Sequence, residues 1–324
     1  MRMLRLLAAA TALCAAMGVS AASAAGYPEH PVKVIVPFAA GGPTDVMARL
    51  IAQKMSEDLK QQFYVENRPG AGGNIGMAEA ARANPDGYTI LVASSSFVVN
   101  PSLYAHAPYD PFKDFAPVTL AAASPNILVV NANFPAKSVK ELIDILKKNP
   151  GKYTIANPGI GTTPQLAAEL FKLELKLDAT SVPFGGAGPA IQSAVAGHTP
   201  IAFTALPPTS PQVKAGALRG LAVTSAKRSA ALPDVPTLEE AGIKSQESET
   251  MQGVFAPART PKDVVALLHK EIAKVMAMPD VKAKCATLGF DPVADTPEQF
   301  TAYIKSEVSK WGKVIEDAKI PQIK

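Results

Sequence analysis

Few of the residues that build disulfides, metal centres and catalytic sites are present. The 324 residues include two cysteines and four histidines. The histidines lie at no metal-ligand spacing from each other or from cysteine, and the H-E-x-x-H motif is absent. No G-x-S-x-G motif occurs, and the run Ser94-Ser95-Ser96 lacks the flanking glycines of a nucleophile elbow. We therefore expect a protein that is not an enzyme and that has no metal and no cofactor.

Long apolar runs are lacking too, except at the N-terminus. Arg2 and Arg5 precede an apolar stretch from Leu6 to Val19, and the small residues Ala22-Ser23-Ala24 follow. This order is typical of a secretory signal peptide, and the stretch is shorter than the roughly 20 residues that a membrane span needs. We expect residues 1–25 to be a cleavable signal peptide that directs the chain to the periplasm of a Gram-negative cell.

Removal of the signal peptide leaves a small net charge and a single cysteine. The formal net charge falls from +4 to +2 with the loss of Arg2 and Arg5, which is too weak for a nucleic-acid binder. Aromatic residues make up 6% of the chain, which argues against a sugar-stacking site. Cys285 cannot form an intramolecular disulfide, and its spacing from Val281 and Leu288 predicts burial on a helix face.

Short apolar runs alternate with amphipathic runs along the rest of the chain. This alternation is typical of βαβ units around a mostly parallel sheet, and roughly 300 residues exceed one usual domain. We expect an α/β protein of two doubly wound lobes, residues 26–122 with 255–324, and residues 123–254. The chain would cross near residues 120–125 and 254–257, forming a two-strand hinge with a ligand cleft between the lobes. We expect a monomer.

One turn occurs twice. The segments Val36–Pro43 and Val182–Pro189 share the pattern V-P-F-x-x-x-G-P, and each follows an apolar run and precedes a helical one. Proline suits the first position of a helix, and glycine leaves backbone N–H groups uncovered. Each turn thus offers unpaired N–H donors and the positive end of a helix dipole, which suit an anion. We predict that the two turns hold one small carboxylate between them.

The predicted site extends to hydroxyl groups on the same side of the sheets. Neither turn contains Arg or Lys, so backbone N–H groups, hydroxyls and water would hold the carboxylate. Ligands of open α/β sheets lie outside the carboxyl ends of the strands. The predicted ligand-binding residues are Phe38, Ala40, Gly41, Gly42, Pro43, Thr44, Asp45, Ser94, Ser95, Gly161, Thr162, Thr163, Phe184, Gly185, Gly186, Ala187, Gly188, Pro189 and Thr204.

Two alternatives stay open within this set. Asp45 either complements the dipole of the first helix or has a site role, ordering the turn or meeting a ligand amine. Each hydroxyl is either a ligand contact or an ordinary helix cap.

Seven blocks of sequence, in order along almost the entire mature chain, resemble one family. They are Val36–Asp45, Glu66–Gly73, Pro85–Thr89, Tyr109–Phe115, Ala222–Ser225, Leu232–Thr237 and Phe255–Pro257. The family is that of the periplasmic solute-binding proteins of tripartite tricarboxylate transporters, often called Bug receptors. The resemblance implies a type II periplasmic-binding-protein fold. It also implies a small organic carboxylate held between residues 38–45 and 184–189, often with bridging waters.

Three positions depart from what is common in that family. Gly185 stands where a basic or large polar residue is frequent, and Gln165 where a histidine is frequent. Met251-Gln252 replaces the usual Trp or Tyr before the late glycine. These changes predict an altered or less polar ligand.

The sequence supports one main function and two alternatives. The main one is a receptor that captures a small organic acid and delivers it to membrane transporter subunits. The acid could be a mono-, di- or tricarboxylate, with or without an aromatic ring or an amino group. The first alternative is a ligand sensor whose closed form docks on the ectodomain of a sensor histidine kinase. The second, an exported hydrolase, lacks a nucleophile and base in the sequence.

Overall fold

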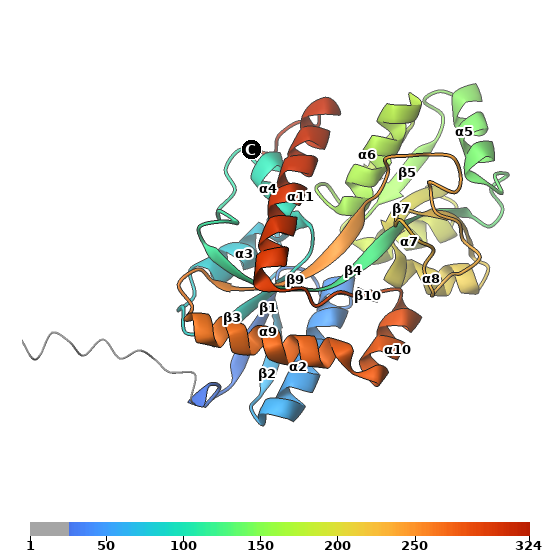
Figure 1. Cartoon of the computed structure of the whole chain (residues 1–324). Coiled ribbons are helices and arrows are strands. Elements are labelled where there is room, and N and C mark those ends of the chain that lie inside the picture. Colours follow the sequence, from blue (N-terminus) through green and yellow to red (C-terminus); the bar gives the residue numbers. More distant parts are fainter. Residues whose placement is uncertain (1–25) are drawn as a thin grey trace, which may run out of the picture.

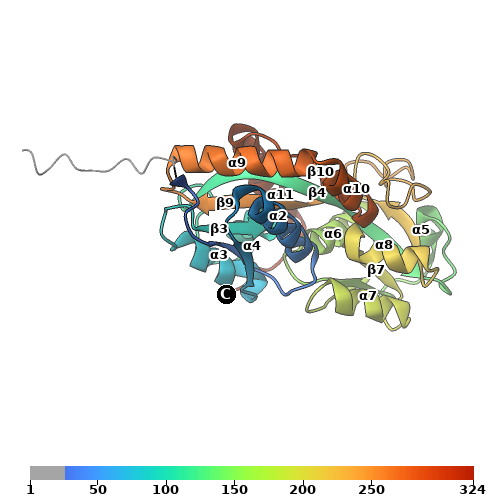
Figure 2. The same ribbon diagram turned by 90° about the horizontal axis from the view of Figure 1, so that it is seen from below.

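A long strand, β4 (Phe115–Asn131), connects two sets of strands (Figure 1). The computed structural model describes residues 26–324, so the predicted signal peptide lies outside the described residues. Nearly all of the 17 residues of β4 are buried, as expected for a strand covered on both faces. Seen from below, β4 runs across the molecule from one set to the other (Figure 2).

The first strand set has the order β2-β1-β3-β9-β4, with β10 on the other side of β4. Its further strands are β1 (Val32–Val36), β2 (Phe63–Asn67), β3 (Thr89–Ala93), β9 (Glu249–Pro257) and β10 (Asp291–Pro292). β1 is parallel to β2 and β3, whereas β9 is antiparallel to both β3 and β4. The sheet is therefore mixed rather than mostly parallel, because β9 brings the chain back from the second set in the opposite direction.

The second strand set forms around the far half of β4. Its further strands are β5 (Thr154–Asn157), β6 (Thr180–Pro183), β7 (Ile201–Ala205) and β8 (Leu218–Val223). β5 is parallel to β6 and β7, and both β7 and β8 are antiparallel to β4.

Helices cover both faces of each set. In the first set α2 (Pro43–Leu59) and α9 (Lys262–Ala277) pack on one face, and α4 (Ser96–Leu103) and α11 (Pro297–Asp317) on the other (Figure 1). In the second set α5 (Val139–Lys148) and α6 (Thr163–Leu175) lie opposite α7 (Ala187–Val195) and α8 (Leu206–Lys214). The remaining helices are α3 (Asn74–Ala81), α10 (Pro279–Leu288) and the short 3₁₀ turn Ala71–Gly73. The predicted doubly wound α/β architecture is confirmed.

Cys285 on α10 belongs to the core of the first set, as predicted. It is fully buried beside Val281 and Phe290, and this burial raises the pKa of the thiol to about 11. Across residues 26–324, no helix combines the length and the apolar character that crossing a membrane requires.

The junction of the two sets lies where β4 changes partners. Pro125 is the last residue of β4 to pair with β9, and Asn126 is the first to pair with β7. β1 and β3 run in the direction of β4, because β9 is antiparallel to both β3 and β4. β5, β6 and β7 run against β4. The carboxyl ends of both groups of strands therefore face each other at this junction.

Gly253 on β9 offers a test of how closely α11 packs on the first sheet. A Cβ there would lie 2.6 Å from Cζ of Phe300 and 2.9 Å from Cε2 of Phe255. We expect Gly253→Ala to lower the free energy of unfolding by about 1–3 kcal/mol through overpacking, measured by urea denaturation. Gly185→Ala is the control, because a Cβ at Gly185 meets no atom within 4 Å. Equal stability of the two variants would contradict this packing.

Candidate ligand-binding site

Five helices begin at the junction, directly after strands that end there. They are α2 after β1, α4 after β3, α6 after β5, α7 after β6 and α8 after β7. No side chain of residues 26–324 caps the N-terminus of any of the five. Away from these carboxyl edges, Ser138 caps α5 and Thr296 caps α11, whereas α9 and α10 have no side-chain cap. The first N–H groups of a helix have no partner within the helix, so the junction gathers donors that suit an anion.

Asp45 orders the first of the two repeated turns. Its buried carboxylate accepts hydrogen bonds from the backbone N–H of Gly41 at 2.9 Å, from Nε of Arg49 at 3.0 Å and from Nδ2 of Asn67 at 2.9 Å. Burial raises the pKa of this carboxyl, but the hydrogen bonds from Arg49, Gly41 and Asn67 outweigh it, so the pKa lies below its ordinary value. Both carboxylate oxygens are therefore engaged in holding the turn.

Asn67 and Arg49 support this turn and were not found by the sequence analysis. Nδ2 of Asn67 also donates to the carbonyl of Phe38 at 3.0 Å, and a guanidinium nitrogen of Arg49 donates to Oδ1 of Asn67 at 3.1 Å. The i, i+4 spacing of Asp45 and Arg49 was a usable signal, since such pairs meet on one helix face. Asn67 gave no such signal, because it reaches the turn from the end of the neighbouring strand.

The glycines of the second turn have open space around them, and the helix that follows this turn begins earlier than predicted. Gly186 is the N-cap of α7 and Ala187 its first residue, so Pro189 is third in the helix rather than first. Proline is tolerated there because its missing N–H would have had no partner within the first turn. A Cβ at Gly185, Gly186 or Gly188 would meet no atom within 4 Å. The N–H groups of Ala187 and Gly188 are thus the helix-start donors of α7.

The third loop reaches across the junction. Thr162, not Thr163, is the N-cap of α6, and its hydroxyl donates to the carbonyl of Gly159 at 2.7 Å. A Cβ at Gly161, where φ is +79°, would lie 2.5 Å from Cδ2 of Leu103 on α4. This loop of the second set therefore touches a helix of the first.

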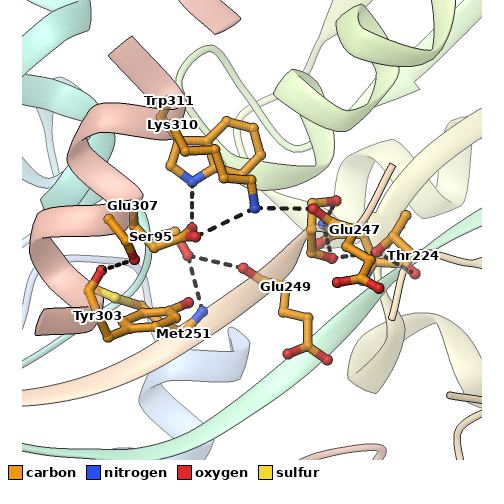
Figure 3. A network of polar contacts seen from close by, with 12 residues as sticks. Ser95, Thr224, Glu247, Glu249, Met251, Tyr303, Glu307, Lys310 and Trp311 are labelled. Carbon is orange, nitrogen blue, oxygen red and sulfur yellow. Dashed lines mark hydrogen bonds and ion pairs between the residues drawn. The ribbon is translucent and has the colours of Figure 1, made fainter. Parts of the chain in front are cut away.

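Several predicted hydroxyls bond to the protein itself. Oγ of Ser95 donates to the carbonyl of Glu249 at 3.2 Å and accepts the N–H of Met251 at 3.0 Å (Figure 3). Oγ1 of Thr163 lies 2.7 Å from Oγ1 of Thr250, and Oγ1 of Thr204 lies 2.6 Å from Oγ1 of Thr209. These hydroxyls fasten the starts of α4 and α6 to β9 and the first turn of α8 to the end of β7. Ser94 is half-buried in the same loop, and Thr44 is buried at the start of α2.

Polar contacts also hold the crossing strands. Fully buried Asn126 donates from Nδ2 to Oγ of Ser248 at 3.2 Å and accepts at Oδ1 from Thr250 at 3.0 Å. From α11, Lys310 donates to the carbonyl of Glu247 at 3.0 Å (Figure 3). The sequence analysis missed Asn126, although polar Ser124 and Asn126 between two apolar runs were a signal for it.

Three surface cavities, the largest of about 1100 Å³, are lined by other residues than the predicted ligand-binding ones. The cleft between the repeated turns therefore stays a prediction. Within residues 26–324, no group of three or more His, Cys, Asp or Glu side chains is placed to hold a metal ion.

Comparisons by family model, by sequence and by structure all lead to the same family. The family model "Tripartite tricarboxylate transporter family receptor" matches residues 47–320. The chain is 35% identical to Protein BugT of Bordetella pertussis over 320 residues, which is 98% of each chain.

Two solved structures are similar throughout. Rpa4515 of R. palustris, solved with adipate, is 34% identical with a TM-score of 0.87 and covers 92% of this chain and 100% of its own. MatC of Rhodopseudomonas palustris, solved with bound malate, is 32% identical with a TM-score of 0.82 and covers 89% of this chain and 100% of its own.

The fold, the family model and the similar solved structures identify a periplasmic solute-binding protein of type II architecture. The chain belongs to the receptor family of tripartite tricarboxylate transporters, which includes the Bug proteins. Members of this family are receptors rather than enzymes, which confirms the prediction that the chain is not an enzyme.

Asp45→Asn tests whether this carboxylate holds the first turn. The amide loses at least one acceptor, so a donor of Gly41 or of Asn67 loses its hydrogen bond to a charged group. We expect the free energy of unfolding to fall by about 1–3 kcal/mol, measured by urea denaturation at pH 7. Asp144→Asn is the matched control, since Asp144 also pairs with a cation four residues away but is exposed on α5. Equal stability of the two variants would show that the turn does not depend on Asp45.

The same carboxylate predicts a dependence on pH. Because the folded-state pKa of Asp45 lies below its ordinary value of 3.8, the stability that it contributes is fully present above that value. This contribution is lost as the pH falls through the lowered pKa. The difference in stability between wild type and Asp45→Asn should therefore shrink below pH 3.8, and a constant difference would contradict the assignment.

Proposed function

We propose that the chain captures a small organic carboxylate at the junction of the two strand sets and delivers it to the membrane subunits of a tripartite tricarboxylate transporter. The observation that carries the proposal is the meeting of uncapped helix starts from both sets at one place. Relatives solved with adipate and malate, both dicarboxylates, support the class of ligand.

The proposed site consists of the two repeated turns and the loops after β3, β5 and β7. Its residues are Phe38, Ala40–Asp45, Ser94, Ser95, Gly161–Thr163, Phe184–Pro189 and Thr204. Asp45, Ser95, Thr163 and Thr204 would act by fixing the loops, because their side chains already bond to the protein. The backbone N–H groups at the starts of α2 and α7 would bind the carboxylate, directly or through water.

Capture would involve closure of two lobes, residues 26–122 with 255–324 and residues 123–254. β4 and β9 both span the boundaries between these ranges, so bending would be confined to two strands. We propose that residues 1–25 direct export to the periplasm and that the mature protein is a monomer there. A closed form that docks on a sensor kinase would use the same site.

Native mass spectrometry of the mature protein tests the proposal. The protein would be purified without refolding, and any bound molecule would then be released by denaturation and identified. We expect an organic acid in equimolar amount, or one acquired on incubation with a panel of carboxylates. Failure to hold any carboxylate under either condition would overturn the proposal. Capture of the sensor-kinase ectodomain rather than of transporter subunits by the loaded protein would replace delivery with sensing.

Gly188→Val tests the second turn directly. The added side chain has open space in the protein but would cover the N–H donors at the start of α7. We expect an unchanged melting temperature and a loss of carboxylate affinity of at least about tenfold, measured by isothermal titration calorimetry. Gln192→Val, an exposed position on the same helix, is the control and should bind normally. Normal affinity of a folded Gly188→Val protein would remove the second turn from the site.

A further inference from the structure

Two fully buried polar side chains at the junction have no hydrogen-bond partner among residues 26–324. They are Gln252 on β9, at both Nε2 and Oε1, and Ser124 on β4, at Oγ. A buried polar group without a partner costs about 1–3 kcal/mol, so such groups are rare in folded proteins. The carboxamide of Gln252 is the more unusual of the two, because neither of its ends is satisfied.

Strand register places these two side chains together. Gln252 lies opposite Ala122 and Thr250 lies opposite Ser124 in the antiparallel pairing of β9 with β4. Directly opposite residues of such a pair project to the same face, and diagonal neighbours are within reach of a long side chain. Gln252 and Ser124 are diagonal neighbours of this kind. We refer to this pair as the junction floor.

The face on which the floor lies is that of the predicted ligand loops. Thr250, next to Gln252 on the same face, contacts Thr163 at the start of α6. On its other side β3 ends at Ala93, which is opposite Gly253, so the register brings Ser94 of the next loop beside Gln252. The floor is therefore bordered by two of the loops that we assign to the ligand.

The segments around the floor lack positive charge. Neither Arg nor Lys occurs in β4, in β9, in either repeated turn, or in residues 94–96 and 157–165. Of the nearby acids, Asp45 is bonded to Arg49, and Glu249 alternates to the opposite face of β9. A second carboxylate buried on the floor would lose its hydration without gaining a cation, which is costly. A neutral polar group that is hydrogen-bonded there costs far less free energy to bury.

We propose that Gln252 and Ser124 bind an uncharged hydrogen-bonding group of the ligand, at the end opposite its carboxylate. A hydroxyl or amide group can donate to Oε1 of Gln252 and accept from its Nε2 or from the serine hydroxyl, so it would satisfy both ends of the carboxamide. This inference rests on the proposed function and narrows its ligand class. The ligand is then a monocarboxylate with a neutral polar tail, and neither a plain fatty acid nor a dicarboxylate is preferred.

A matched series of acids tests the inference by isothermal titration calorimetry. The six-carbon probes are hexanoate, 6-hydroxyhexanoate, adipamate (the monoamide) and adipate, and the four-carbon probes are their shorter counterparts. We expect the hydroxy acid or the monoamide of one length to bind about tenfold more tightly than the alkyl acid and the diacid of that length. Gln252→Leu should abolish this preference and leave the affinity for the alkyl acid unchanged or higher.

Ser124→Ala provides the second variant, with an expected partial loss of the same preference. It removes only one hydroxyl, so it keeps the test available if Gln252→Leu does not fold, as judged by its melting temperature. A wild type that prefers the diacid, or variants that weaken all four acids of a length equally, would overturn the role of the floor and leave the receptor function standing. Failure of all eight acids to bind the wild type would overturn the receptor proposal for small aliphatic acids, and this inference with it.

Discussion

The register of β4 is the constraint on which the rest of the architecture depends. One continuous strand pairs with β9 up to Pro125 and with β7 from Asn126 onward, and both partners are antiparallel to it. Because β3 is antiparallel to β9 whereas β5 is parallel to β7, the helix-preceding strands of the two sets run in opposite senses. The strands that precede α2 and α4 therefore end facing the strands that precede α6 and α7. Helix starts from distant parts of the sequence meet because of this reversal, and no direct contact between the two repeated turns is needed to explain it.

At the junction, side chains that hydrogen-bond to the protein itself can be told apart from polar groups that have no partner. The carboxylate of Asp45 and the hydroxyls of Ser95, Thr163 and Thr204 are all engaged with the protein, and they hold loops in place. The helix starts lack side-chain caps, and the floor residues Gln252 and Ser124 lack partners among the described residues. Donors and acceptors remain available mainly on the backbone of the turns and on the floor between them.

Sequence reasoning recovers the parts of this arrangement that depend on local rules. The repeated turn identifies both helix starts, because proline and glycine constrain the backbone wherever they occur, and Pro43 is indeed the first residue of α2. The same rule misplaces the start of α7 by two residues, since proline is tolerated throughout the first helical turn. Asn67 and Asn126 escape detection because their importance comes from strand pairing, and Gln252 is noticed only as a departure from what is common in the family. In the sequence, these amides are only isolated polar residues within or beside apolar strands. The strand register is needed to show which groups lie next to them.

The uncapped helix starts have an evolutionary consequence. A backbone N–H donor cannot be removed by changing a side chain, unless the new residue is proline. An anion-binding site made of such donors therefore tolerates extensive sequence change. Side chains on the floor are encoded residue by residue and can change one at a time. In the proposed site, exchange of a few buried amides or hydroxyls would therefore change which ligand is preferred, while the backbone donors for the acid group would be retained.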